Sequence, residues 1–301
     1  MNRPVNILAL AFRGEKKEVV FEKLEEQIKE NTDLVLLPEM WLGDDYPVQT
    51  KDSSLLKEIG DFAAKHSCYV VCPLGYSEKE DGSQRLNSAL VYDRKGELVY
   101  RYDKIFPWWN EFDFVPPITV GTSAGVFDAD FGRVGIAICF DVNFSCIWEE
   151  MARCGAELVL WPSDYSAGRS LQAHAINYHY YIVTATRACD SALIDLSGDE
   201  AAYHKSEGIT AAHYIIDLDR EIFHENFNME KIEKQFVEDT IKEICRNFCY
   251  SAYDIEKIVD AVIDDVIKDI EETADIEFNS DDVKIGFTRV LLKKLYPECS
   301  F

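Results

Sequence analysis

The stretch Arg133-Val-Gly-Ile-Ala-Ile-Cys-Phe-Asp141 is a strongly apolar run that ends on a single thiol. Such a run is typical of a buried strand, and here it delivers Cys139 to a sharp turn. Two further runs end in a similar way: Asp33-Leu-Val-Leu-Leu-Pro-Glu39 ends on a carboxylate, and Glu97-Leu-Val-Tyr-Arg-Tyr-Asp-Lys104 ends on an ammonium group. Three strand ends therefore offer an acid, a base and a sulfur, which is the set that a cysteine hydrolase without a histidine base requires.

Helical and strand patterns alternate around these runs. Strands are predicted at 5–12, 33–37, 68–76, 84–92, 96–102, 126–131, 134–138, 157–161, 181–186, 192–195 and 209–216, and helices at 16–31, 53–66, 147–154 and 170–180. Residues 106–122, rich in proline and aromatic residues, are predicted to form a loop. Because a β-α-β pattern occurs twice, we expect an α/β sandwich whose sheets are covered by helices.

The sequence changes character near residue 228. Residues 229–248 and 253–270 have the pattern of acidic amphipathic helices, and a short basic and apolar piece follows at 284–296. We therefore predict a hydrolase domain at 1–227 and an acidic helical C-terminal extension at 228–301. The extension is expected to pack on the domain or on a second subunit; the alternative is a regulatory or partner-docking segment.

Composition and charge exclude several classes of protein. The chain has 301 residues, enough for one large or two small domains, and its net charge of −24 disfavours nucleic acids and anionic membranes as partners. The apolar run 5–12 is too short for a signal sequence, and no run reaches the ~20 residues of a membrane span. The nine cysteines are expected to be reduced in a cytoplasmic protein. They form no zinc-ligand set with histidine, so we expect no metal and no other cofactor.

Three motifs, in order, resemble those of the nitrilase superfamily of carbon–nitrogen hydrolases. They are Leu36-Leu-Pro-Glu-Met40, Tyr102-Asp-Lys-Ile-Phe-Pro107 and Gly132-Arg-Val-Gly-Ile-Ala-Ile-Cys-Phe-Asp141. The segments 155–163 and 175–177 also resemble the family, and the resemblance covers about residues 5 to 225. It implies a four-layer α-β-β-α sandwich that assembles into homodimers or larger homo-oligomers and acts on a small molecule.

The resemblance also implies roles for particular residues. Amides are poor electrophiles, so the nucleophile is a thiolate, here that of Cys139. Glu39 acts in turn as base and acid, and Lys104 faces the oxyanion together with the backbone N–H of Phe140. Glu111 resembles a second family glutamate that orients the lysine or the substrate. Asp113, two positions away, leaves that last assignment open.

The surroundings of the nucleophile depart from true nitrilases. Those enzymes usually carry Trp-Glu after the cysteine, whereas Phe140-Asp141 stands here and favours amides or carbamoyl compounds over nitriles. The family's common Phe-Pro-Glu becomes Phe144-Ser-Cys146, which removes family-typical contacts. The residues expected to bind substrate are Phe140, Asp141, Trp109, Phe144, Tyr165 and Arg169.

Other readings of these residues stay open. The aromatic rim (Trp41, Trp108, Trp109, Phe144 and Tyr165) packs an apolar substrate stem or, equally, forms core or dimer contacts. Arg169 pairs with a substrate carboxylate or forms a surface salt bridge. The six histidines are expected to be structural.

These observations predict a cysteine-dependent hydrolase of a small linear amide or N-carbamoyl compound. A thioester would form and release ammonia or an amine. The alternatives are an amide- or acyl-transfer enzyme with the same triad, a catalytically idle scaffold or binding protein, and a papain-like protease, which requires a Cys–His pair. Replacement of Lys104 by Met is expected to slow turnover by ~10²–10³ with little change in stability.

Overall fold

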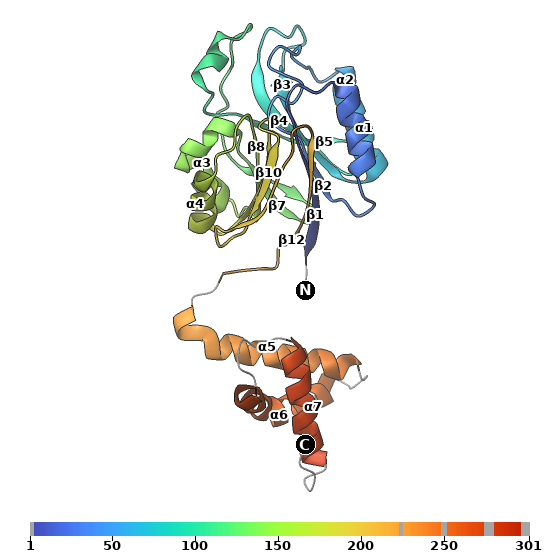
Figure 1. The fold of residues 1–301 in the computed structure, drawn as a ribbon, viewed down its shortest axis with the longest axis vertical. Helices are drawn as coiled ribbons and strands as arrows, with labels where there is room; N and C mark the ends of the chain where they lie inside the picture. Colours follow the sequence, from blue (N-terminus) through green and yellow to red (C-terminus); the bar gives the residue numbers. More distant parts are fainter. Residues whose placement is uncertain (1–2, 223–224, 248–251, 274–279, 296–301) are drawn as a thin grey trace. The chain divides into compact units, whose positions relative to one another are not determined.

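The computed structural model describes residues 3–222, 225–247, 252–273 and 280–295 (Figure 1). Contacts divide the chain into two units, 1–222 and 223–301. No helix in these described ranges is both long and apolar enough to cross a bilayer.

One six-stranded sheet carries the N-terminal strand next to its edge strand. Its order is β12 (Thr210–Asp217), β1 (Pro4–Ala11), β2 (Leu34–Leu36), β3 (Tyr69–Tyr76), β4 (Leu86–Tyr92) and β5 (Leu98–Asp103). β2 runs parallel to β1 and β3, whereas the other neighbours pair antiparallel. The predicted hairpin of 84–92 and 96–102 is the β4–β5 pair.

The second six-stranded sheet carries the apolar run that precedes Cys139. Its order is β11 (Glu200–Lys205), β10 (Asp190–Ile194), β9 (Tyr181–Thr186), β8 (Leu158–Ser163), β7 (Gly132–Ile136) and β6 (Val126–Ala129). β7, β8 and β9 are parallel. Their carboxyl ends therefore meet at one edge, where loops commonly form binding sites.

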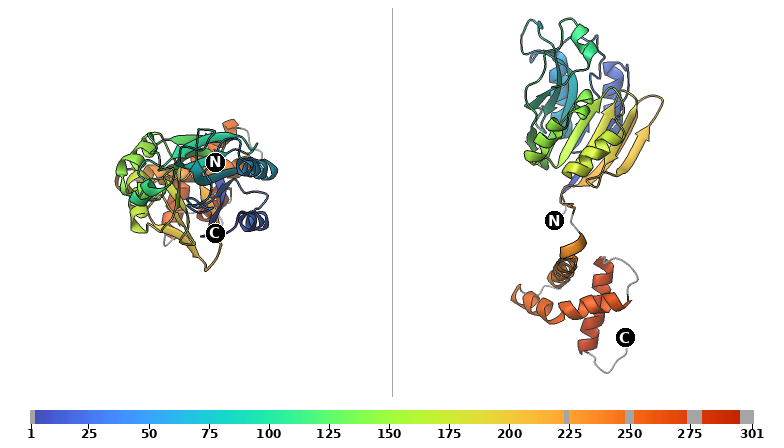
Figure 2. Two further views of the ribbon diagram at one scale, coloured as in Figure 1. Left: turned by 90° about the horizontal axis from the view of Figure 1, so that it is seen from above. Right: turned by 90° about the vertical axis from the view of Figure 1, so that its left-hand side faces the viewer.

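Three apolar cores define four layers. The central core joins the inner faces of both sheets, with Ile7 and Leu36 from one sheet and Ile136 and Leu160 from the other. A second core lies under α1 (Lys17–Gln27) and α2 (Ser54–His66), and a third lies under α3 (Ser145–Arg153) and α4 (Arg169–Tyr178). The helices thus cover the outer faces of the sheets (Figures 1 and 2), which confirms the predicted α-β-β-α sandwich.

Two local features differ from the prediction. β11 was not predicted because its sequence, Glu-Ala-Ala-Tyr-His-Lys, is polar and mostly exposed at the sheet edge, so it lacks the apolar alternation of a buried strand. The loop 106–122 contains a short 3₁₀ helix, η1 (Trp109–Asp113). Backbone hydrogen bonds close the base of this loop, from Thr119 N to Arg85 O at 2.6 Å and from Gly121 N to Lys104 O at 2.8 Å.

The second unit contains three helices in its described residues: α5 (Glu225–Asn247), α6 (Ala252–Thr273) and α7 (Ser280–Leu295). They share an apolar core of their own, to which all three helices contribute. The apolar face of the helix predicted at 253–270 is part of this core: Val262 and Val266 are buried and Ile258 is partly buried. The acidic positions between them, Asp260 and Asp264, are exposed, as an amphipathic helix requires.

Candidate active site

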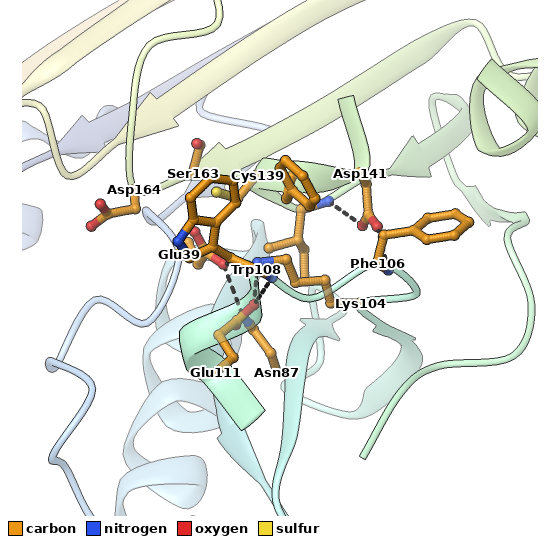
Figure 3. Close-up of polar contacts among 12 residues, drawn as sticks. Glu39, Asn87, Lys104, Phe106, Trp108, Glu111, Cys139, Asp141, Ser163 and Asp164 are labelled. Atoms are coloured by element: carbon orange, nitrogen blue, oxygen red, sulfur yellow. Dashed lines mark hydrogen bonds and ion pairs between the residues drawn. The ribbon is translucent and has the colours of Figure 1, made fainter. Parts of the chain in front are cut away.

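Cys139 lies where β7 turns into a short 3₁₀ helix, η2 (Cys139–Asn143). Its backbone has φ +48°, a left-handed conformation that typically costs a residue with a side chain about 1–3 kcal/mol. Two contacts hold the turn: Asp141 N donates to Ile138 O at 3.0 Å, and Trp161 Nε1 donates to Cys139 O at 3.1 Å. The strained turn therefore places the thiol at the strand end (Figure 3), beside the carboxyl end of β8.

A closed ring of hydrogen bonds lies beside the thiol. Lys104 Nζ donates to Glu39 Oε1 and to Glu111 Oε2, both at 2.8 Å. Asn87 Nδ2 donates to Glu39 Oε1 and to Glu111 Oε1, also at 2.8 Å (Figure 3). All four side chains are buried. Because Asn87 and Lys104 face each other on β4 and at the end of β5, the hairpin itself sets this spacing.

Burial and charge set the protonation of the ring. Burial disfavours the charged form of Lys104, but its carboxylate neighbours, Glu39 first and then Glu111, outweigh this effect and raise the pKa of the ammonium group. Burial also raises the pKa of Glu111, and the neighbouring Lys104 only partly offsets this. The lysine is therefore charged at neutral pH, with two of its three N–H donors used in the ring.

The thiol is held in its neutral form. Burial, and then the charge of Glu39, raise the pKa of Cys139 well above the usual range. Lys104, the Asp164 backbone and the Ser163 side chain act in the opposite direction without reversing the shift. A nucleophile of this kind has to lose its proton to a neighbouring base as it attacks.

Glu39 offers one oxygen for that purpose. Its Oε1 accepts from Lys104 and Asn87, whereas its Oε2 is buried and has no hydrogen-bond partner among the described residues. An unpaired carboxylate oxygen away from water is costly, so such an atom marks a place where a proton or a ligand is received.

Glu39, Lys104, Glu111 and Cys139 line a cavity of about 460 Å³. Phe140 and Tyr165, both predicted to bind substrate, are in its wall together with Trp108 and Phe114. The other polar residues of the lining are Asp44, Asn110, Asn143, Asp164 and Arg187. No histidine in the described part of the chain lines this cavity, which leaves the papain-like alternative without a base.

Four of the predicted substrate-binding residues lie elsewhere. Trp109 is 69% exposed and contacts Trp108 in a tilted arrangement, with ring centroids 3.6 Å apart. Phe144 stacks on Phe106, with ring centroids 3.6 Å apart. Arg169 is exposed at the first turn of α4. None of these three residues lines the cavity. Trp41, predicted at the rim, is a core residue that donates to Cys72 Sγ.

The fourth of these predicted residues, Asp141, is a buried structural residue that does not line the cavity. It is fully buried; its Oδ1 accepts from Phe106 N at 2.9 Å, and its Oδ2 accepts from Tyr102 Oη at 2.7 Å and Ile138 N at 3.0 Å. Burial raises the pKa of this carboxyl to about 6, although the three donors favour its charged form. Two of these donors, Tyr102 and Phe106, lie on either side of Lys104 in the sequence, and the third, Ile138, directly precedes Cys139. Asp141 therefore holds the lysine segment against the turn that carries the nucleophile.

The structure adds residues that the sequence pattern did not indicate. Asn87 is the clearest of them, and its only signal was an amide in the mostly apolar strand Leu86–Tyr92. Asp44, Asp164 and Arg187 follow three different strands and meet only through the fold.

The chain is similar in sequence to known proteins. A family model described as carbon–nitrogen hydrolase matches residues 11–220. The chain is 25% identical over 268 residues to the deaminated glutathione amidase of Yersinia enterocolitica, covering 82% of this chain and 90% of that protein. It is 31% identical over 180 residues to a nitrilase of Pyrococcus abyssi, covering 55% of this chain and 66% of that protein.

Solved structures show the same fold. A CN-hydrolase superfamily protein from Xanthomonas campestris matches with a TM-score of 0.60 at 18% identity, over 70% of this chain and 90% of that one. A variant of the amidase from Nesterenkonia sp. AN1 matches with a TM-score of 0.59 at 17% identity, over 71% of this chain and 89% of that one. In that amidase the acetamide moiety of fluoroacetamide is attached covalently to the active-site cysteine.

Proposed function

Since the chain belongs to the carbon–nitrogen hydrolase family, we propose that it hydrolyses the C–N bond of a small linear amide or N-carbamoyl compound through a thioester on Cys139. The observation that carries this proposal is the buried ring beside the thiol, in which Glu39 Oε2 is left without a partner. The amidases among the relatives and solved structures support the same reaction class.

The first half of the reaction breaks the C–N bond. The thiol proton moves to Glu39 Oε2 as Sγ attacks the carbonyl carbon. The carbonyl oxygen becomes an oxyanion that accepts from the third N–H of Lys104 Nζ and from the Phe140 N–H. As the tetrahedral species collapses, Glu39 gives the proton to the leaving nitrogen, and ammonia or an amine departs.

The second half restores the enzyme. A water molecule gives a proton to Glu39 while its oxygen attacks the thioester carbon. The C–S bond then breaks, the acid product leaves, and the sulfur takes the proton back from Glu39. Glu111 Oε2 accepts hydrogen bonds from both Lys104 Nζ and Trp108 N, so the role of Glu111 is to hold the lysine in place.

Intact-mass spectrometry after mixing with fluoroacetamide, together with ammonia release from a small amide panel, tests the proposal. We expect ammonia release and an adduct that maps to Cys139 and is absent from Cys139→Ala. The exposed Cys146 provides an internal control for nonspecific alkylation. An unmodified Cys139 together with a lack of ammonia would refute hydrolysis and favour the scaffold alternative.

A further inference from the structure

Two buried tryptophans donate hydrogen bonds to the backbone of the nucleophile turn. Trp161 Nε1 donates to Cys139 O at 3.1 Å. Trp148 Nε1 donates to Asp141 O, also at 3.1 Å. Both side chains are fully buried in the third apolar core, where an indole N–H requires an acceptor. The turn is therefore tied to the core at two of its carbonyl groups.

The peptide unit between Cys139 and Phe140 connects one of these bonds to the reaction. A trans peptide is planar, so its C=O and its N–H point in opposite directions. The Cys139 carbonyl accepts from Trp161, and the N–H across the same plane is that of Phe140, the proposed oxyanion donor. In the described part of the chain this N–H donates to no other residue, and Phe140 lines the cavity beside Cys139. The indole thus sets the direction of an N–H that is free to bind substrate.

The position of Trp161 is itself well fixed. It lies in β8, which pairs with β7 on one side and with β9 on the other, and its register partner in β9 is Thr184. Tyr165 of the cavity wall meets the indole edge to face, with ring centroids 5.7 Å apart. The turn needs such support because Cys139 has φ +48°, a conformation that residues with a side chain rarely adopt. A donor that is fixed before the reaction costs no reorganisation when charge develops on the carbonyl oxygen.

The bond from Trp148 is of the same kind but holds a different peptide plane. It fixes the unit between Asp141 and Val142, and the N–H of that unit belongs to Val142. Val142 is buried and does not line the cavity. The two tryptophans therefore have matched burial and matched hydrogen bonds, and they differ in whether the peptide that they hold faces the substrate.

We propose that Trp161 is a positioning residue for the oxyanion donor: its Nε1–H fixes the Cys139–Phe140 peptide so that the Phe140 N–H faces the developing oxyanion. This inference rests on the proposed hydrolysis. A hydrogen bond to the carbonyl of a peptide also polarises the N–H of the same peptide, which strengthens it as a donor. Trp161 acts only through this peptide and touches no reacting atom.

Steady-state ammonia release by two variants tests the role. Trp161→Phe keeps an aromatic ring and removes the indole N–H, and Trp148→Phe is the matched control. We expect Trp161→Phe to lower kcat roughly ten- to hundredfold with little change in KM, because a displaced donor weakens binding of the transition state alone. Trp148→Phe should keep kcat and KM close to wild type. Trp161→3-benzothienylalanine, which has sulfur in place of the N–H in a ring of the same shape, should repeat the loss with the packing preserved.

Alkylation of Cys139 by iodoacetamide separates the oxyanion donor from the thiol. In this reaction Sγ attacks the methylene carbon, iodide leaves, and the thiol proton passes to Glu39, so no oxyanion forms. The rate of alkylation, followed by intact-mass spectrometry, should therefore stay close to wild type in Trp161→Phe while hydrolysis is slowed.

The outcomes separate the two proposals. An active wild type with an unchanged kcat in both Trp161 variants overturns the positioning role and leaves hydrolysis standing. Equal losses of kcat in Trp161→Phe and Trp148→Phe do the same, as do equal losses of alkylation and hydrolysis in Trp161→Phe, because they report packing or the thiol. A wild type that releases no ammonia and forms no adduct on Cys139 refutes the proposed function and the positioning role with it.

Discussion

Replacement of Lys104 by Met tests whether the buried ring is as tightly coupled as its geometry indicates. Lys104 is 2% exposed and is the ion-pair partner of both Glu39 and Glu111. Removing one partner of a buried ion pair typically costs about 3–5 kcal/mol, because a charge is left uncompensated. We therefore expect a loss of unfolding free energy of this size, in contrast to the small change that the sequence alone suggested, in addition to a rate loss of ~10²–10³ from the missing oxyanion donor.

Urea unfolding followed by tryptophan fluorescence measures the stability effect. All five tryptophans lie in the first unit, so the signal reports that unit alone: Trp41, Trp108, Trp109, Trp148 and Trp161. Without Lys104 the pKa of Glu111, already raised by burial, rises further. A carboxyl whose pKa is higher in the folded state costs stability above its unfolded pKa of ~4.3, so the deficit should shrink as the pH falls toward that value.

A second substitution separates charge from packing. In Lys104→Met/Glu111→Gln one of the two uncompensated carboxylates is gone, so part of the lost stability should return while the activity stays low. A Lys104→Met variant with unchanged unfolding free energy would refute the view that the ring is buried and mutually compensated. Near-normal turnover would separately refute the oxyanion role of the lysine.

Three further predictions concern the neighbours of the thiol. Glu39→Gln should abolish acylation, which a rapid-quench measurement of the adduct detects; a normal burst would exclude Glu39 as the base. Asn87→Leu removes two hydrogen bonds to carboxylates, each worth about 1.5–3 kcal/mol, and should lower kcat more than it raises KM; a change in KM alone would contradict a positioning role. Wild-type stability should fall as the pH rises from about 4 to about 6, because the folded pKa of Asp141 is raised to about 6. Asp141→Asn should reduce this dependence of the unfolding free energy on pH in urea unfolding. An unaltered slope would show that another group titrates there.

The sequence predicted the helix-covered sheets and the three strand-end residues, Glu39, Lys104 and Cys139, because both depend on local patterns. Apolar runs such as 133–138 mark buried strands, and each motif places one side chain just after a strand. Glu111 was found through resemblance, and it meets Lys104 as expected. The catalytic roles of these residues stay predictions, as do the cytoplasmic location and the homo-oligomeric state.

Other parts of the site depend on contacts between segments distant in sequence. Asn87 is one polar residue in a strand, and its partners are 24 and 48 positions away. Asp141 was expected to touch substrate because it follows the nucleophile so closely. A 3₁₀ turn after Cys139 reverses its direction, and the carboxylate then faces the lysine segment. No periodicity in the sequence reports such a turn.

The closed base of the loop at 106–122 has a consequence for divergence. The Gly121–Lys104 and Thr119–Arg85 hydrogen bonds hold both ends of the loop independently of its middle. Lengthening a loop whose ends are already joined costs little, since the closure entropy grows only with the logarithm of its length. Insertions and deletions between Phe114 and Thr119 can therefore accumulate while Lys104 and Glu111 stay in register with Glu39. A new substrate range can thus arise by exchange of one surface segment on an unchanged chemical core.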